Sequence, residues 1–426
     1  MGNYFSFGEY NKFYKYMWIY LALKLFIGIV LNYGLIFDQI KIKYLQIQYG
    51  PLITMQFGYI TYIIVSSIIL IITKNKKKKE IQKDLSGIEL IYNIPDIELG
   101  KYKSDYFFLV NIFLAVISDI IQESLNKFKC GMFGFWMFDM LFIHLINSRI
   151  LKAKIYKHHK YSLLFILFSC SILQTIVIII NFTNDTENVK IFHNRKWLIP
   201  IMIIVNLFMN IFNAYILSIE KYYFEKRFIP INLFILFYGI FGIITTSIFV
   251  IITTFVPCGN DPVSDLVQII CDYDEDKNAY FFVSYSIYFK KFDTDYLGWR
   301  IIIEIIHSLV YYVSIYYCFV IFQLLNPINQ ICMYSFHSLI IRILFIINDL
   351  INKDNITNFD IISNVLSFTI LLFFLAGTIV YLEFIELNFC ELNFYVKRNI
   401  QERADSDNLF NLYDINSEGS IEEAIE

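Results

Sequence analysis

Charged residues are scarce in this 426-residue sequence, because Asp, Glu, Lys and Arg make up only 17% of it, against about a quarter in soluble domains. Glycine and proline are also few, with 16 and 7 residues, whereas hydrophobic residues reach 57%. This composition excludes an ordinary soluble domain and indicates an integral membrane protein. The net charge of −3 says nothing about partners, because the position of each charge relative to the bilayer is what matters.

Motifs of several functional classes are absent. The seven cysteines are dispersed and include no CxxC pair, so the sequence predicts neither a disulfide scaffold nor a structural metal site. No GxxxxGK[ST] loop occurs, which argues against an ATP-driven pump, and neither HExxH nor GxSxG occurs. We therefore expect no enzyme, no cofactor and no metal. The first residues lack the pattern of a cleaved signal peptide, so the first apolar segment is expected to remain as an anchor.

Apolar runs long enough to cross a bilayer recur along the sequence. A transmembrane helix needs about 20 apolar residues, because its backbone must satisfy its own hydrogen bonds across the hydrocarbon core. This rule predicts an all-α polytopic membrane protein with ten spans, at residues 17–37, 52–73, 105–125, 131–150, 161–181, 197–218, 230–255, 299–324, 330–350 and 359–386.

Lys and Arg are unevenly distributed between the connecting segments. With the N-terminus inside, the inner segments carry most of them, including the run at 76–79 and a group at 149–160 that contains Arg149, Lys152, Lys154 and Lys157. Cytoplasmic loops are rich in these residues, so we expect both termini inside. The run at 76–79 lacks interleaved aromatic residues and adjoins a bilayer, which indicates contact with lipid headgroups and not with nucleic acid.

The expected outer segments contain features of a secretory compartment. The three N-glycosylation sequons, at Asn181, Asn184 and Asn355, all fall there. The outer loop at 256–297 also contains Cys258 and Cys271, which in an oxidising lumen form either a disulfide or two free thiols. We expect an endomembrane location, such as the Golgi, the ER or a vacuole-like compartment, before the plasma membrane, with mitochondria less favoured.

The ten predicted spans divide into two sets of five. With an odd number of spans in each, the two sets must have opposite orientations, as in the inverted repeats of many secondary transporters. We predict a cytoplasmic N-terminus at 1–16, a first repeat at 17–181, a luminal loop at 182–196, a second repeat at 197–386 and an acidic cytoplasmic tail at 387–426.

Several predicted spans contain ionisable residues, each of which costs at least about 2.5–3.5 kcal/mol at the bilayer centre. The candidates for a substrate or ion path are Asp119, Asp139, Glu304, His307 and Arg342. Glu304 and His307 are three residues apart on one predicted helix, where a carboxylate beside an imidazole can exchange a proton. Asp119 and Arg342, one in each half, are candidates for an ion pair that gates the path.

Other ionisable residues have simpler interpretations. Lys24 stands near a span end, so we expect its ammonium group to extend to the headgroups. His158 and His159 stand among lysines, with no acid or cysteine near them in the sequence. We therefore interpret these two histidines as interfacial residues and not as metal ligands.

Four short stretches are similar to the drug/metabolite transporter superfamily, in its nucleotide-sugar-transporter-like branch of solute carriers. They are the aspartate in ISDI at 117–120, FWMF at 135–138, SRILKAK at 148–154 and GTIVY at 377–381. This resemblance implies ten helices in two inverted repeats and transport of a polar organic solute. It also implies that Arg149, Lys152, Lys154 and Lys157 form a basic rim at the cytoplasmic mouth, where an anionic solute would first be held.

The leading hypothesis is a secondary carrier that moves a polar organic solute, such as a nucleotide sugar or another metabolite, by alternating access. Two other classes stay open: a proton-path or structural subunit of a larger organellar membrane complex, and a non-transporting scaffold on the same fold. The expected partners are the lipid bilayer and the small polar solute. A homodimer is left open, and no nucleic acid is expected.

Overall fold

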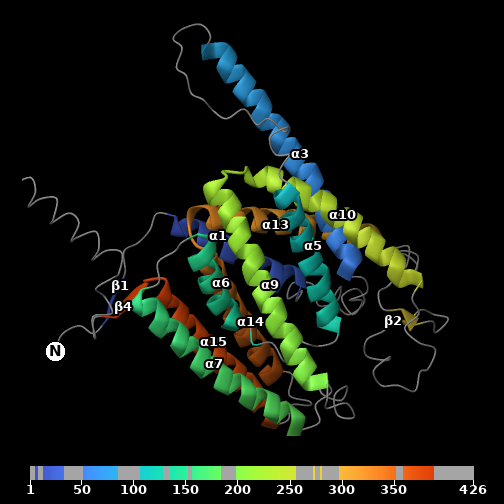
Figure 1. Ribbon diagram of the computed structural model, residues 1–426. Coiled ribbons are helices and arrows are strands. Elements are labelled where there is room, and N and C mark those ends of the chain that lie inside the picture. Colours follow the sequence, from blue (N-terminus) through green and yellow to red (C-terminus); the bar gives the residue numbers. More distant parts are fainter. Residues whose placement is uncertain are drawn as a thin grey trace, which may run out of the picture.

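The computed structural model describes residues 5–7, 13–32, 51–84, 106–127, 135, 137–151, 156–183, 198–255, 272–273, 279–280, 297–351 and 358–387 (Figure 1). Within them, helices coincide with every range in which the sequence predicts a span. They are α1 (Tyr14–Leu25), which continues into the π-helical segment η1 (Phe26–Asn32), α3 (Pro51–Asp84), α5 (Tyr106–Lys127), α6 (Met137–Ile150), α7 (Lys157–Thr183), α9 (Leu198–Lys226), α10 (Ile231–Phe255), α13 (Leu297–Leu324), α14 (Pro327–Ile351) and α15 (Asn358–Tyr381).

Six helices in the described part of the chain are long and apolar enough to cross a membrane: α3, α7, α9, α10, α13 and α15. A shorter apolar stretch, Phe107–Gln122, lies in α5. Large apolar side chains on these helices are exposed, for example Phe168 at 73% and Ile204 at 65%, as expected for surfaces that face lipid. The chain is an all-α, multi-pass integral membrane protein.

Two helices extend beyond their predicted ends. α9 ends at Lys226 and not at residue 218, and near its end Lys221 forms an ion pair with Glu225 at 3.0 Å. The Lys221 ammonium also donates to the carbonyl oxygen of Leu325. α3 ends at Asp84, so the lysine run at 76–79 lies on the last turns of this helix, which project beyond the other helices (Figure 1). Charged residues continue both helices after the apolar stretch has ended.

Two antiparallel pairs of long helices lie on opposite sides of the molecule, α3 with α10 and α7 with α15 (Figure 1). Each pair approaches closely at a glycine. A Cβ atom at Gly242 of α10 would overlap the ring of Tyr59, and one at Gly377 of α15 would overlap the side chain of Ile166. Small residues at such crossings allow backbones in a membrane to pack by van der Waals contact.

The remaining helices connect these two pairs. α6 packs on α9 and α1 packs on α14, while α5 contacts α10 and α3 contacts α13. In addition, α5 contacts α9 and α1 contacts α13. The largest apolar cluster joins α3, α5, α9, α10 and α13, and its fully buried rings include Phe108, Phe234 and Phe322.

Two short strands bring together segments that are far apart in the sequence. β1 (Phe5–Phe7) pairs antiparallel with β4 (Ile385–Leu387), with Ser6 opposite Glu386. Between α10 and α13, β2 (Asp272–Tyr273) pairs with β3 (Ala279–Tyr280). The segment before α1 therefore lies beside the segment after α15.

α15 ends in a Schellman motif, in which the Phe384 N–H donates to the carbonyl of Ile379 at 3.0 Å. Glu383 takes the left-handed position of this motif, with φ of 61°. Glycine is the usual residue there, because a side chain in this conformation costs about 1–2 kcal/mol. As a residue that ends the helix, Glu383 is therefore less favourable than glycine.

Candidate functional site

Asp119 of α5 lies beside the α3–α10 crossing, where two tyrosines bind its carboxylate. The Tyr238 hydroxyl of α10 donates to Oδ2 of Asp119, and the Tyr59 hydroxyl of α3 donates to the same oxygen at 3.4 Å. Both tyrosines are buried. A carboxylate in a membrane requires such partners, because an unpaired one is costly to remove from water.

Further aromatic residues extend this arrangement. The Tyr62 ring lies 5.8 Å from that of Tyr59 and 6.1 Å from that of Tyr312. The Tyr312 hydroxyl donates to Oδ1 of Asn232 at 3.0 Å and lies 3.3 Å from the hydroxyl of Ser66. We call Tyr59, Tyr62, Tyr238 and Tyr312, together with Asp119, the tyrosine–aspartate cluster.

A second carboxyl group, which unlike that of Asp119 is buried, lies near this cluster. Glu220 of α9 is only 7% exposed and is close enough to Asp119 for the two groups to interact electrostatically. Sequence reasoning missed Glu220, because the charges that follow it ended the predicted span at residue 218. The sequence did contain a signal that the helix continues past Glu220. Apolar residues precede residues 220–221, and Tyr222 and Tyr223 follow them.

Lys24 of α1, which we expected to extend to the headgroups, is half-buried and lies beside two aromatic rings. Its ammonium nitrogen is 4.9 Å from the ring centroid of Tyr311 and 5.7 Å from that of Tyr20. The Tyr20 hydroxyl accepts a hydrogen bond from the Gln330 side chain of α14 at 3.2 Å. Cation–π contacts of this kind stabilise a desolvated ammonium group.

The other predicted path residues occupy several helices. His307 lies on α13, with its ring 6.0 Å from that of Tyr311, so it adjoins Lys24 across that tyrosine. Asp139 lies on α6, half-buried, and its Oδ1 has no hydrogen-bond partner among the described residues. Arg342 is half-buried on α14. Glu304 lies three residues before His307 on α13, and its side chain is outside the described part.

The remaining predicted residues lie mostly at helix ends or outside the described residues. Arg149 and Lys157 are exposed, at the end of α6 and the start of α7. Asn181 belongs to the last turn of α7 and not to a loop. The described residues do not include Lys152, Lys154, Asn184, Asn355, Cys258 or Cys271.

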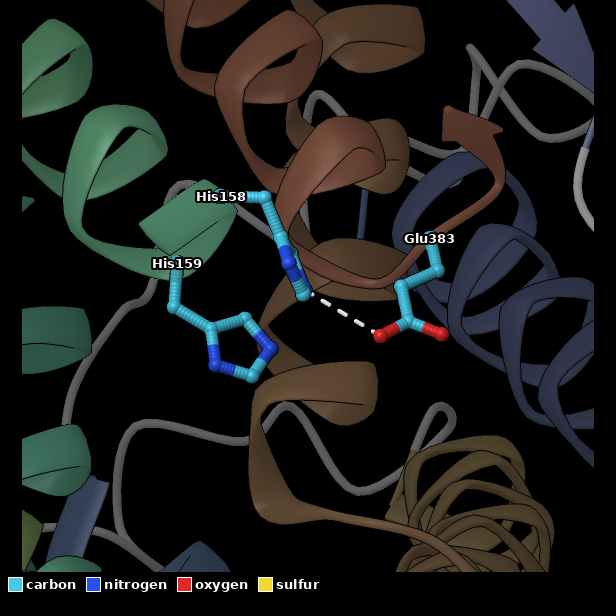
Figure 2. A group of neighbouring side chains, drawn as sticks. All are labelled: His158, His159 and Glu383. Atoms are coloured by element: carbon cyan, nitrogen blue, oxygen red, sulfur yellow. Dashed lines mark ion pairs between the residues drawn. The ribbon is translucent and has the colours of Figure 1, made fainter. Parts of the chain in front are cut away.

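A separate polar group, the histidine cluster, lies where α7 begins and α15 ends (Figure 2). It consists of His158, His159 and Glu383, and Nε2 of His158 is 3.1 Å from Oε1 of Glu383. The two imidazole centroids are 4.1 Å apart. No acid stands near these histidines in the sequence, but Glu383 reaches His158 from the end of α15, so the sequence argument against metal ligands does not hold.

Tyr381 supports the histidine cluster from α15. Its ring stacks on His159 with centroids 4.5 Å apart, and its hydroxyl is hydrogen-bonded to Nδ1 of His144 on α6. Next to Glu383 in the sequence, Phe384 contacts Tyr14 of α1, with the two ring centroids 4.7 Å apart. Burial, and then the charge of Glu383, raise the pKa of the Tyr14 phenol.

Comparison with known proteins gives no relative: no protein-family model matches the chain, and no curated protein matches it.

Proposed function

We propose that this protein is a secondary transporter, which moves a small polar organic solute by alternating access between two inverted repeats of five helices. The first repeat comprises α1, α3, α5, α6 and α7, and the second comprises α9, α10, α13, α14 and α15. In transporters of this design the solute binds near the midplane, between the repeats.

The pattern of helix contacts carries this proposal. If each helix of the first repeat is exchanged for its counterpart in the second, the pairs α3–α10 and α7–α15 map onto themselves. The contact of α6 with α9 becomes that of α14 with α1, and the contact of α5 with α10 becomes that of α13 with α3. A two-fold relation between the repeats would produce such exchangeable contacts, whereas an arbitrary bundle has no reason to show them.

The strand pair of β1 and β4 supports the orientation. Paired strands lie about 4.8 Å apart, so residues 5–7 and 385–387 lie on the same side of any membrane that the helices cross. An even number of crossings between them follows, in agreement with ten spans and with both termini inside. The basic residues at both ends of the 149–160 segment favour that side as the cytoplasmic one.

The tyrosine–aspartate cluster supports a solute rich in hydroxyl groups. Buried phenol hydroxyls and a carboxylate supply donors and acceptors, and the rings of Tyr62 and Tyr312 supply flat apolar faces. Lys24, near Tyr311, adds a positive charge within the same part of the protein. A sugar-bearing metabolite with an anionic group, such as a nucleotide sugar, matches this combination.

The two acids favour coupling to protons. Glu220 is buried on α9 and Asp119 belongs to the tyrosine–aspartate cluster, and carboxyl groups within helices that cross a membrane are typical of proton relays. A proton path through the protein, the second candidate function, would use the same two residues. Counterflow without any pH gradient separates the two functions, because only a carrier exchanges labelled for unlabelled solute.

The test is counterflow in proteoliposomes that contain the full chain, with nucleotide sugars and other polar metabolites screened as labelled solutes. We expect Asp119→Asn to slow exchange by at least about tenfold, since a hydrogen bond to a charged group contributes about 1.5–3 kcal/mol. The matched control is Glu225→Gln, which changes a carboxylate at the end of α9, outside the cluster. Unchanged exchange in Asp119→Asn, Glu304→Gln and Arg342→Gln would disprove this path even if the protein transports a solute.

Localisation has its own test. We propose an endomembrane location with the sequons in the lumen, so a glycosidase should increase the gel mobility of the wild type. Asn184→Gln combined with Asn355→Gln should abolish that shift. No shift in the wild type, together with co-fractionation with mitochondria, would favour the organellar complex instead.

A further inference from the structure

The histidine cluster combines ligand types that transition metals prefer. Imidazole nitrogen and carboxylate oxygen bind Zn²⁺ at about 2.0–2.2 Å, and two histidines with one glutamate form a known three-ligand set that leaves a fourth position open. One ligand atom each from His158, His159 and Glu383 lie within 4.8 Å of one another. Figure 2 shows both imidazole rings directed toward the space beside the Glu383 carboxylate.

The geometry of His158 and Glu383 fits two ligands of one ion. Their Nε2 and Oε1 atoms are 3.1 Å apart, yet Nε2 forms no hydrogen bond of ordinary geometry with any described residue. Two ligand atoms of a tetrahedral zinc ion are about 3.3 Å apart and point at the metal, not at each other. The distance between Nε2 and Oε1 therefore matches that between two ligand atoms of one metal ion. The relative orientation of the imidazole and the carboxylate does not match that of a hydrogen-bond donor and its acceptor.

The nitrogen atoms of the two imidazoles are available for a metal. His158 is 3% exposed, and its Nδ1 also has no hydrogen-bond partner among the described residues. Nδ1 of His159 faces the Tyr156 backbone N–H at 3.4 Å, so the Nε2 of this ring is the atom on the cluster side. Binding through Nε2 leaves the ring proton on Nδ1, so the long contact in which Nδ1 accepts from the Tyr156 N–H is lost.

The backbone at Glu383 gives independent support. This residue has φ of 61° at the end of α15, where glycine is the favoured residue. Retaining a glutamate there has a cost in conformation, and that cost has a reason if the carboxylate is required as a ligand. The lysines that flank the two histidines in the sequence, Lys157 and Lys160, are exposed, so solvent screens their repulsion of a cation.

We propose that His158, His159 and Glu383 form a binding site for a divalent transition metal of the zinc class. The ion joins the start of α7 to the end of α15, next to the segment that β1 and β4 form. A water molecule or another ligand completes its coordination.

The test uses the tag-free full chain in detergent micelles, because a polyhistidine tag would bind the same metals. After treatment with EDTA, the protein is titrated with Zn²⁺ by calorimetry and with Co²⁺, whose visible absorption intensifies on four-coordinate binding. We expect one equivalent of either ion per chain and a higher unfolding temperature with Zn²⁺. No bound zinc, or a cobalt spectrum like that of the aqueous ion, would overturn the proposal without any variant.

Variants then assign the ligands. His159→Gln and Glu383→Gln should each weaken zinc binding at least about tenfold, since even outer-shell partners contribute 10–100-fold. His337→Gln removes a half-buried imidazole on α14, outside the histidine cluster, and should leave the affinity unchanged. Equal affinity in the wild type and in the variant that combines His159→Gln and Glu383→Gln would disprove this site.

Glu383→Gly distinguishes a ligand from a structural ion pair. Glycine relieves the left-handed conformation, so we expect the metal-free variant to unfold at a higher temperature than the metal-free wild type, with zinc binding lost. A variant that keeps zinc binding, or one that is less stable than the wild type without metal, would show that Glu383 serves only to pair with His158.

Discussion

The α3–α10 pair and the α7–α15 pair each carry a polar cluster, but the two clusters differ in how completely their buried polar groups are satisfied. Beside α3 and α10, Asp119 accepts hydrogen bonds from Tyr59 and Tyr238. Beside α7 and α15, the described buried atoms without a hydrogen-bond partner include both nitrogens of His158 and Nε2 of His144.

This difference separates two ways of using a buried polar group. Under the proposed function, a solute that enters the tyrosine–aspartate cluster would exchange one set of hydrogen bonds for another, so its binding would be reversible. Buried groups without partners are costly, and a bound ion would supply the contacts that the nitrogens of His158 lack. The first cluster therefore suits transient contacts along a path, and the second suits a tightly held ion.

The largest effect is expected where α3 and α10 touch. Gly242→Ala should destabilise the protein by about 2–3 kcal/mol, because the added Cβ overlaps the Tyr59 ring and overpacking costs that much. The matched control is Gly58→Ala on α3, where nothing lies within 4 Å of the added atom. That variant should be unchanged or up to about 1 kcal/mol more stable. Unfolding in mixed micelles measures both, and equal losses would contradict the close crossing.

The next largest effect concerns the bond between a phenol and a carboxylate. Tyr238→Phe removes a hydrogen bond to a charged acceptor, so we expect a loss of about 2 kcal/mol in the free energy of unfolding. Tyr161→Phe, which removes an exposed hydroxyl on α7, serves as the control and should change nothing measurable. If both variants behave alike, Asp119 is neutral or bound differently.

The corresponding change in the second cluster should have a smaller effect. Tyr381→Phe removes a bond between two neutral groups, the phenol and His144, for which about 1 kcal/mol is expected. The same unfolding assay applies. A loss as large as that of Tyr238→Phe would mean that His144 carries a charge, and the contrast between the clusters would disappear.

The smallest effects compare two buried serines. Ser66→Ala should cost about 1 kcal/mol, because its hydroxyl lies 3.3 Å from that of Tyr312. Ser162→Ala on α7 should stay within about 0.5 kcal/mol of the wild type, since the hydroxyl of Ser162 has no partner among the described residues. A reversed order in unfolding experiments would contradict the distinction between satisfied and unsatisfied clusters.

The helices could be predicted from the sequence, because lipid offers no hydrogen bonds to a backbone and a long apolar run therefore has to be helical. Sequence reasoning failed to predict two kinds of feature: where some helices end, and which side chains contact one another. α9 continues through Glu220 to Lys226, since Lys221 finds Glu225 and the carbonyl of Leu325 as partners. Lys24, half-buried on α1, lies beside the rings of Tyr311 and Tyr20, which are contacts that its place near a span end did not predict.

The sequence by itself determined that the chain is helical, crosses a membrane several times and contains ionisable residues such as Asp119 inside it. Only the tertiary structure decided which groups meet. Helices in lipid choose their neighbours by shape and close packing, because apolar faces are equally satisfied by lipid tails. No pattern along the chain could therefore place Tyr59 and Tyr238 on Asp119, or bring Glu383 to His158 and His159.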